Sequence, residues 1–163
     1  MITDKDMVTR KDTADQSLTE VIRLAIQDNI DRIPFTRDGG YIATEISKDG
    51  TDGTVDICLS GYLVDYGIMM HEINVIYFDT VQQAKRFLRS PEGQGFNDTY
   101  SNGQDCFDFT ARAGDPVILQ RITAILKNHF GYTEQSHFVI RTYSNVHYFK
   151  KDPNFVRPKP MEN

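Results

Sequence analysis

Alternating apolar and polar residues at positions 54–63 constrain the fold of this chain more than any other feature. A strand with this period of two has one apolar side and one polar side. The apolar side carries Val55, Ile57, Leu59 and Leu63, and the polar side carries Thr54, Asp56, Ser60 and Tyr62. Turn signals precede the segment at 48–53 and follow it at 65–67. We therefore expect an antiparallel meander with strands at about 41–47, 54–63 and 69–78.

Three helices are expected at about 17–33, 79–89 and 115–130, where apolar residues recur every three or four positions. Ser17 and Glu20 form a capping box at the start of the first helix. Asp115 is the expected N-cap of the third helix, with proline at the next position.

Further strands are expected at about 105–112, 136–143 and 146–150, which gives the element order α-β-β-β-α-β-α-β-β. The two β-α-β crossovers could add parallel pairings to the meander. The expected fold class is α+β, with a mixed, mainly antiparallel sheet and three helices. Residues 91–104, rich in Gly, Asn, Gln and Ser, are expected to form a long polar loop, either disordered or used for binding.

The 163 residues suffice for one hydrophobic core, so residues 16–150 are expected to form a single domain. Residues 1–15 are polar without periodicity and are expected to form a mobile N-terminal tail; residues 151–163 are expected to form a C-terminal tail. No run approaches the roughly 20 apolar residues that span a bilayer. Cys58 and Cys106 lack CxxC spacing, and no secretory signal is visible. These features favour a cytoplasmic protein with reduced thiols.

Residues 36–78 contain two basic and seven acidic residues, so their net charge of −5 equals that of the whole chain. Charge concentrated on one element favours an acidic face and a basic partner, and it disfavours direct nucleic-acid binding. In the simplest register, three carboxylates share one face of the meander with two polar side chains. These residues are Glu45, Asp56, Glu72, Tyr62 and Asn74. The face could be a solvated sheet surface, a docking surface, or a catalytic or cation site.

The junction before the second predicted helix reads Tyr77-Phe78-Asp79-Thr80-Val81-Gln82-Gln83-Ala84. The element order of residues 17–150 resembles that of GNAT-type N-acetyltransferases, which implies a Gln/Arg-x-x-Gly-x-Gly/Ala loop for the pyrophosphate of coenzyme A at such a junction. This chain has no glycine there and carries a carboxylate where a phosphate would sit. The family's binding residues therefore do not transfer, and no cofactor is expected.

Motifs for other chemistry are absent from the sequence. The four histidines, His71, His129, His137 and His147, form no HxH, HExxH or HxxxH pair, so a metal site would need distant segments to converge. No GxSxG motif is found, and Cys58 lies in mid-strand among apolar neighbours, as inert buried thiols do. No catalytic residue is assigned.

These features lead to the hypothesis of an acidic cytoplasmic binding protein that neutralises or regulates a basic protein partner. The functional class would be that of immunity or inhibitor proteins of toxin–antitoxin systems, with a toxin or nuclease as the partner. The expected partner-binding residues are Glu45, Asp56, Glu72, Tyr62 and Asn74. Complementary charge of this kind raises the association rate and sharpens specificity.

Two alternatives stay open. One is a small enzyme of unknown chemistry, with a pocket formed by residues 91–104, His137 and His147. It requires a deep cavity that contains a histidine or carboxylate of shifted pKa. The other is a structural or assembly subunit, which requires an exposed apolar strand that self-associates.

Overall fold

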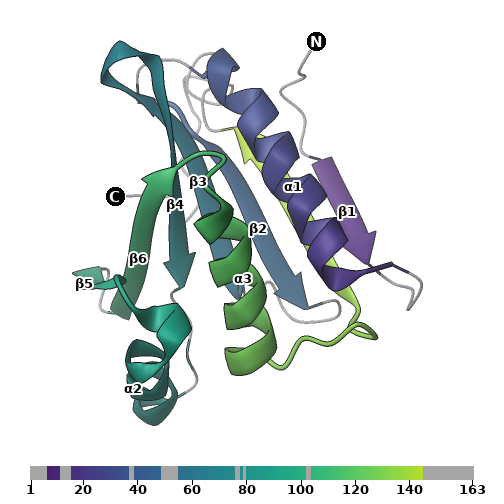
Figure 1. Ribbon diagram of the computed structural model, residues 1–163, viewed down its shortest axis with the longest axis vertical. Helices are drawn as coiled ribbons and strands as arrows, with labels where there is room; N and C mark the ends of the chain where they lie inside the picture. Colours follow the sequence, from purple (N-terminus) through teal and green to yellow (C-terminus); the bar gives the residue numbers. More distant parts are fainter. Residues whose placement is uncertain are drawn as a thin grey trace, which may run out of the picture.

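The computed structural model describes residues 7–11, 16–36, 39–48, 55–75, 78, 80–101 and 104–144. Over these residues, seven strands form one antiparallel sheet, and three α-helices pack against one of its faces (Figure 1). The α+β fold class and the three helices are confirmed. The predicted element order is also confirmed as far as the strand at Phe138–Ser144, with two further strands that the sequence did not reveal.

The sheet has the strand order β1-β7-β2-β3-β4-β6-β5. The strands are β1 (Met7–Lys11), β2 (Ile42–Lys48), β3 (Ile57–Val64), β4 (Ile68–Val75), β5 (Asn97–Ser101), β6 (Gln104–Arg112) and β7 (Phe138–Ser144). The helices are α1 (Leu18–Arg32), α2 (Val81–Arg89) and α3 (Pro116–His129), and short 3₁₀ turns lie at Ile33–Phe35, Asp65–Gly67 and Pro91–Gly93.

Three predictions about the sheet need correction. Residues 7–11, expected in a mobile tail, form edge strand β1 beside β7. Residues 97–101, expected in a loop, form the opposite edge strand β5 beside β6. Each pairing among the described strands is antiparallel, so the crossovers add no parallel pair there. Both edge strands are five residues long, and pairing through the backbone of a neighbour requires little side-chain pattern.

Other tail and strand predictions lie outside the described residues. This holds for the strand expected at 146–150, for the C-terminal tail at 151–163 and for residues 1–6.

Local sequence signals fix where the helices begin. Thr80 and Gln83 form a complete capping box at α2, and Asp115 accepts a hydrogen bond from the Val117 amide at the start of α3. Ser17 caps α1 as expected by accepting from the Glu20 amide. The Glu20 carboxylate instead pairs with the Arg23 guanidinium, so the reciprocal half of the predicted capping box is replaced by an ion pair.

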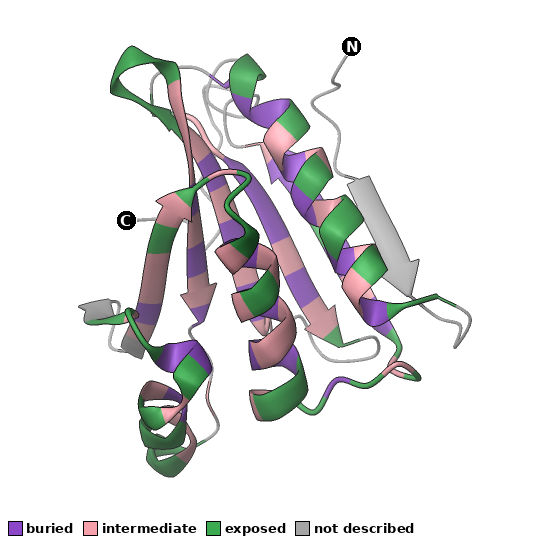
Figure 2. Cartoon of the chain, in the orientation of Figure 1, coloured by how far each residue is buried: buried purple, intermediate pink, exposed green. Residues whose placement is uncertain are grey.

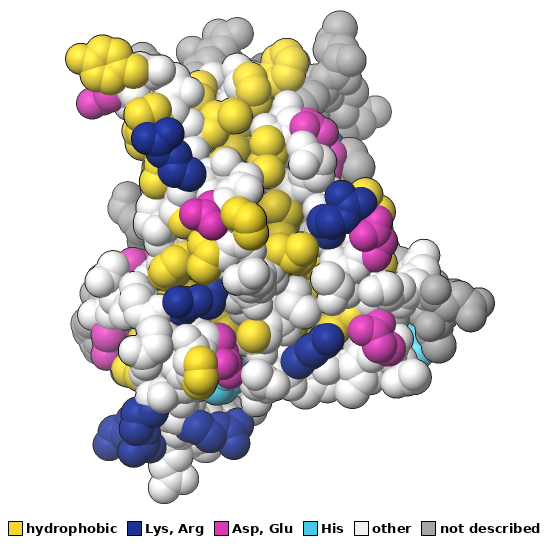
Figure 3. All heavy atoms as spheres, viewed as in Figure 1, with side chains coloured by type: hydrophobic (Ala, Val, Ile, Leu, Met, Phe, Trp, Pro, Cys, Tyr) yellow, Lys and Arg dark blue, Asp and Glu magenta, His cyan; other side chains and the backbone are white. Residues whose placement is uncertain are grey.

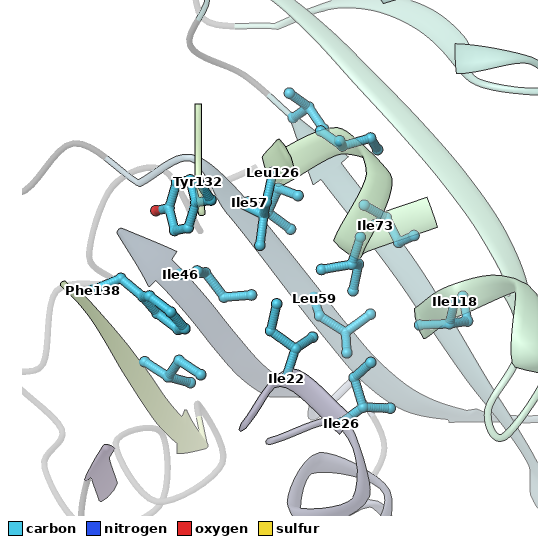
Figure 4. Packing of buried hydrophobic residues seen from close by; sticks show 14 of the residues in the cluster. Ile22, Ile26, Ile46, Ile57, Leu59, Ile73, Ile118, Leu126, Tyr132 and Phe138 are labelled. Carbon is cyan, nitrogen blue, oxygen red and sulfur yellow. The ribbon is translucent and has the colours of Figure 1, made fainter. Parts of the chain in front are cut away.

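The hydrophobic core lies between the helices and one face of the sheet (Figures 2 and 4). Because side chains alternate along a strand, every second residue of β2, β3, β4, β6 and β7 points into this layer. The buried residues include Leu18, Ile22 and Ile26 of α1, Ile118, Ile122, Ile125 and Leu126 of α3, and Ile46, Ile57, Leu59, Ile73, Phe138 and Ile140 of the sheet. The three- and four-residue steps in both helices give the apolar stripe that this packing needs.

A buried polar network crosses this apolar layer beneath the end of α1. The Asn29 side-chain amide donates to Thr44 Oγ1 at 2.9 Å and lies 3.2 and 3.4 Å from the carbonyl oxygens of Ile42 and Leu59. Asn29 Oδ1 is 2.9 Å from His71 Nε2. Since Oδ1 can only accept, Nε2 carries the proton in this hydrogen bond. Burial lowers the pKa of His71 to about 4, which agrees with a neutral ring.

Gly61 makes room for this network. A Cβ atom at this position would lie 2.2 Å from Asn29 Oδ1 and 2.7 Å from a side-chain carbon of Ile33. Only glycine allows α1 to approach the sheet this closely, so the position of α1 depends on a residue of β3.

A second buried contact holds the segment after α2 against α3. The Glu92 carboxylate accepts from His129 Nε2 at 2.8 Å and from Asn128 Nδ2 at 3.2 Å. Arg121 donates to the carbonyl oxygens of Glu92 and Gln94. Part of the predicted 91–104 loop is thereby fixed in the fold.

Candidate functional site: the helix-free face of the sheet

The second face of the sheet carries no described helix, and we call it the helix-free face. It is formed by the strand residues that alternate with the core residues. Its described members include Ala43, Glu45, Cys58, Ser60, Tyr62, Met70, Glu72, Asn74, Asn97, Asp108, Thr110, Arg112, Arg141 and Tyr143. Four of the five predicted partner-binding residues, Glu45, Glu72, Tyr62 and Asn74, lie on this face.

Strand register arranges the carboxylates in two neighbouring rows. In the first row, Glu45 lies opposite Cys58, Cys58 opposite Asn74, and Asn74 opposite Asp108. In the second row, Glu72 lies between Ser60 and Thr110. Since adjacent strands are about 4.8 Å apart, Glu45 and Asp108 are separated by roughly 14 Å across the sheet. The carboxylates therefore form a broad surface.

This spacing does not suit a metal ion. Oxygen ligands of one cation lie about 2.0–2.6 Å from it, so their carboxylates must converge. The described residues contain no group of three or more His, Cys, Asp or Glu side chains that could hold a metal ion.

Asp56, the fifth predicted residue, does not join this surface. Tyr132, a member of the hydrophobic core, donates its hydroxyl to Asp56 Oδ2 at 2.7 Å. A bend at Asp56 precedes β3, and strand alternation begins only at Ile57. The prediction began the strand at residue 54, three residues before β3, so it included Asp56 in the strand alternation.

Neutral donors orient the carboxylates of the helix-free face. Tyr143 donates its hydroxyl to Glu45 at 2.9 Å, and Asn74 donates to Glu72 at 3.2 Å. Asn97 donates to Asp108 at 3.2 Å. These hydrogen bonds orient the carboxylates through donor groups that carry no charge.

Burial, together with neighbouring carboxylates, raises the pKa of three groups on this face. Burial, followed by the charge of Glu45, raises the pKa of the Cys58 thiol to about 12. Burial also raises the pKa of Tyr62, and the charge of Glu72 adds to the effect. The pKa of Tyr143 is raised by burial and then by Glu45. A thiol with so high a pKa stays protonated, which supports the prediction of an inert Cys58.

Two arginines border the carboxylates. Arg141 of β7 lies directly opposite Glu45, and Arg112 of β6 lies opposite Met70. Arg141 therefore offsets part of the charge at Glu45. Glu72 and Asp108 instead lie opposite uncharged residues of the neighbouring strands.

Sequence reasoning missed Asp108, Asn97 and Tyr143 as members of this face. Asp108 had a signal, because Cys106, Asp108 and Thr110 alternate with apolar residues along β6. No sequence signal marks Tyr143 and Asn97, since their positions on the face depend on β7 joining β2 and on β5 pairing with β6.

The histidines do not form a catalytic site in the described part of the chain. His71 is 0% exposed and hydrogen-bonded to Asn29, so no substrate reaches it. His129 is buried against Glu92, and His137 is exposed in the segment before β7. His147, the other histidine of the predicted pocket, lies outside the described residues.

An open groove lies on the outer side of the helices. Its lining consists of Thr19, Leu119, Gln120, Thr123, Ala124, Lys127 and Asn128. This lining has no histidine or carboxylate, and Lys127 is its one ionisable side chain.

None of the described helices combines the length and the apolar character needed to cross a bilayer. Comparisons of the chain with protein-family models, with curated proteins and with solved structures found no match.

Proposed function

We propose that this chain is a binding protein that docks a basic protein partner on the helix-free face and thereby neutralises or regulates it. The observation that carries the proposal is the placement of Glu72 and Asp108 on a sheet face without a described helix. Both carboxylates are held by amide donors, so they present fixed negative charge. Fixed charge on a broad surface suits recognition of Lys and Arg side chains.

The composition of the face supports the same role. Glu45, Tyr62 and Asn74 surround the two central carboxylates, and tyrosine adds contact area and a hydrogen bond at low entropy cost. An inhibitor or immunity function follows if the covered surface of the partner is its active site. A cytoplasmic location is part of the proposal, because Cys58 and Cys106 are both free thiols.

Single charge reversals test the proposal. The partner would be captured from source cells, identified by mass spectrometry, purified and titrated at about 50 and 200 mM salt, because screening weakens surface electrostatics over this range. We expect Glu72→Lys to weaken binding at least tenfold at the lower salt concentration and to reduce the salt dependence. Asp31→Lys makes the same change of charge on the exposed side of α1 and should bind like the wild type. Equal affinities for both variants would contradict the proposal.

A further inference from the structure

The β3–β4 hairpin projects beyond the upper end of α3, to about the level of the upper end of α1 (Figure 1). Its tip is largely exposed, and hydrophobic atoms gather there on the side shown in Figure 3. Six large hydrophobic residues are exposed in the described chain, and three of them lie at this tip. They are Leu63 (38% exposed), Val64 (41%) and Tyr66 (102%).

Tyr66 has a backbone conformation that tyrosine rarely adopts. Its φ is 65° and its ψ is 20°, and it is the only non-glycine residue with a positive φ in the described chain. In this left-handed region, the Cβ of an L-residue crowds the backbone, so turns normally use glycine or asparagine. The next residue, Gly67, adopts a positive φ of 75° without this steric cost, because glycine has no Cβ.

The fold provides no compensation for this strain. The Tyr66 side chain is fully exposed, so it contributes nothing to the packed core. Asparagine at the same position would form the turn at a lower conformational cost. Strained, exposed side chains that do not serve the fold point to a function outside it.

Apolar side chains flank Tyr66 on both sides of the hairpin. Leu63 pairs with Met69, and their alternation places them on the helix-bearing side. Val64 pairs with Ile68 on the other side. Together these residues form an apolar prong, which we define as Leu63, Val64, Tyr66, Ile68 and Met69. A projecting prong with a tyrosine at its apex fits a concave apolar pocket, where aromatic anchors contribute most to binding.

The charge around the prong favours a protein partner. The prong continues into the helix-free face, because Met70 lies between Ile68 and Glu72 on that side of β4 and Tyr62 is the neighbour of Met70 on β3. Asp65 at the apex and Glu72 behind it outnumber Arg112, the cation opposite Met70. Anionic lipid headgroups would be repelled by these carboxylates, and a second copy of the chain would present the same charge.

We propose that the β3–β4 hairpin is a docking prong that inserts Tyr66 into an apolar pocket beside the basic surface of a protein partner. The basic character of the partner rests on the function proposed for the helix-free face. The prong supplies apolar contacts that slow dissociation, and the carboxylates steer association.

Photocrosslinking in the full chain tests the contact directly. p-Benzoylphenylalanine would replace Tyr66 in one variant and Val81 in a control, since Val81 is an exposed apolar residue at the start of α2. In source-cell lysate, we expect the variant at position 66 to crosslink to a protein other than this chain. The control variant at position 81 should not crosslink to that protein. A missing crosslink at position 66, a crosslink to a second copy of this chain, or co-sedimentation with phosphatidylserine vesicles would each overturn the proposal.

Titration of the variants with the partner that crosslinking identifies then separates the two proposals. We expect Tyr66→Asn to weaken binding at least tenfold and to leave the salt dependence unchanged, whereas Glu72→Lys should reduce that dependence. Wild-type affinity for Tyr66→Asn together with weak binding of Glu72→Lys would overturn the prong and retain the acidic docking face. The reverse result would retain the prong and overturn the docking face.

The melting temperature of the free protein is the last readout. Because asparagine relieves the strain at position 66, Tyr66→Asn should melt at or above the wild-type temperature. A lower melting temperature would show that Tyr66 supports the fold itself, and it would overturn the proposal.

Discussion

The two faces of the sheet are formed by alternate residues of the same strands, yet they are under different physical constraints. Ile73 and its neighbours on the helix-bearing face are fully buried beneath α1 and α3. Glu72, one residue earlier on β4, is half-buried on the helix-free face beside neutral polar side chains. Packing therefore determines the first face, whereas the second face is buried only in part: Ala43 and Tyr143 are buried there, and Glu72 is partly exposed. A carboxylate cluster on that second face calls for an explanation outside the fold.

Truncation of one residue on each face should show the largest contrast. Ile73→Ala leaves a cavity in the core and should lower the free energy of unfolding by about 4 kcal/mol. Glu72→Ala, its matched control on the same strand, should change that free energy by less than about 0.5 kcal/mol. Urea unfolding followed by circular dichroism measures both values. A loss above about 2 kcal/mol for Glu72→Ala would show that the helix-free face is also constrained by stability.

The polar network within the helix-bearing face should be almost as sensitive as its apolar part. Asn29→Ala leaves His71, Thr44 and two carbonyl groups with fewer partners, so we expect a loss of about 3 kcal/mol. Gln27→Ala, on the exposed side of the same helix, should cost less than about 0.5 kcal/mol. Chemical denaturation of the two variants tests this difference, and similar values for both would contradict the structural role of the network.

His71 should make stability depend on pH. Its pKa is near 4 in the folded protein and about 6.5 in the unfolded chain, so acid protonates the unfolded state first. The contribution of the neutral ring is therefore present above about pH 6.5 and is lost as the pH falls toward 4. Between pH 7 and 5, linkage predicts a loss of about 2 kcal/mol. The free energy of unfolding should fall more steeply between pH 7 and 5 for the wild type than for His71→Gln. Parallel plots of this free energy against pH would show that His71 is not the titrating group.

The smallest predicted effect on stability comes from the hydrogen bond to Asp56, whose loss should not affect partner binding. Tyr132→Phe removes the hydrogen bond to Asp56 and should lower the free energy of unfolding by about 1 kcal/mol. Binding of the partner should not change, because this pair lies apart from Glu72 and Asp108. Calorimetric titration of the variant checks this, and a tenfold loss of affinity would return Asp56 to the docking surface.

Much of the fold was accessible from the sequence because its signals are local. The alternation at 54–63 predicted β3, and the apolar stripe with the Asp115 cap predicted α3. β1 and β5 escaped prediction because edge strands this short are defined by the backbone of a neighbour. Four of the five predicted partner-binding residues lie on the helix-free face, and Asp56 does not, because strand alternation does not reveal where a strand begins.

The sequence by itself determined the periods of the strands and helices, the caps, and the concentration of acidic residues between positions 36 and 78. Only the tertiary structure decided that β7 joins β2, that Asp108 lies beside Asn74, and that Asn29 meets His71 above Gly61. The physical reason is the distance along the sequence between the residues that interact. Periodicity and capping follow from residues a few positions apart, whereas register and strand order depend on which distant segments bury their apolar sides together.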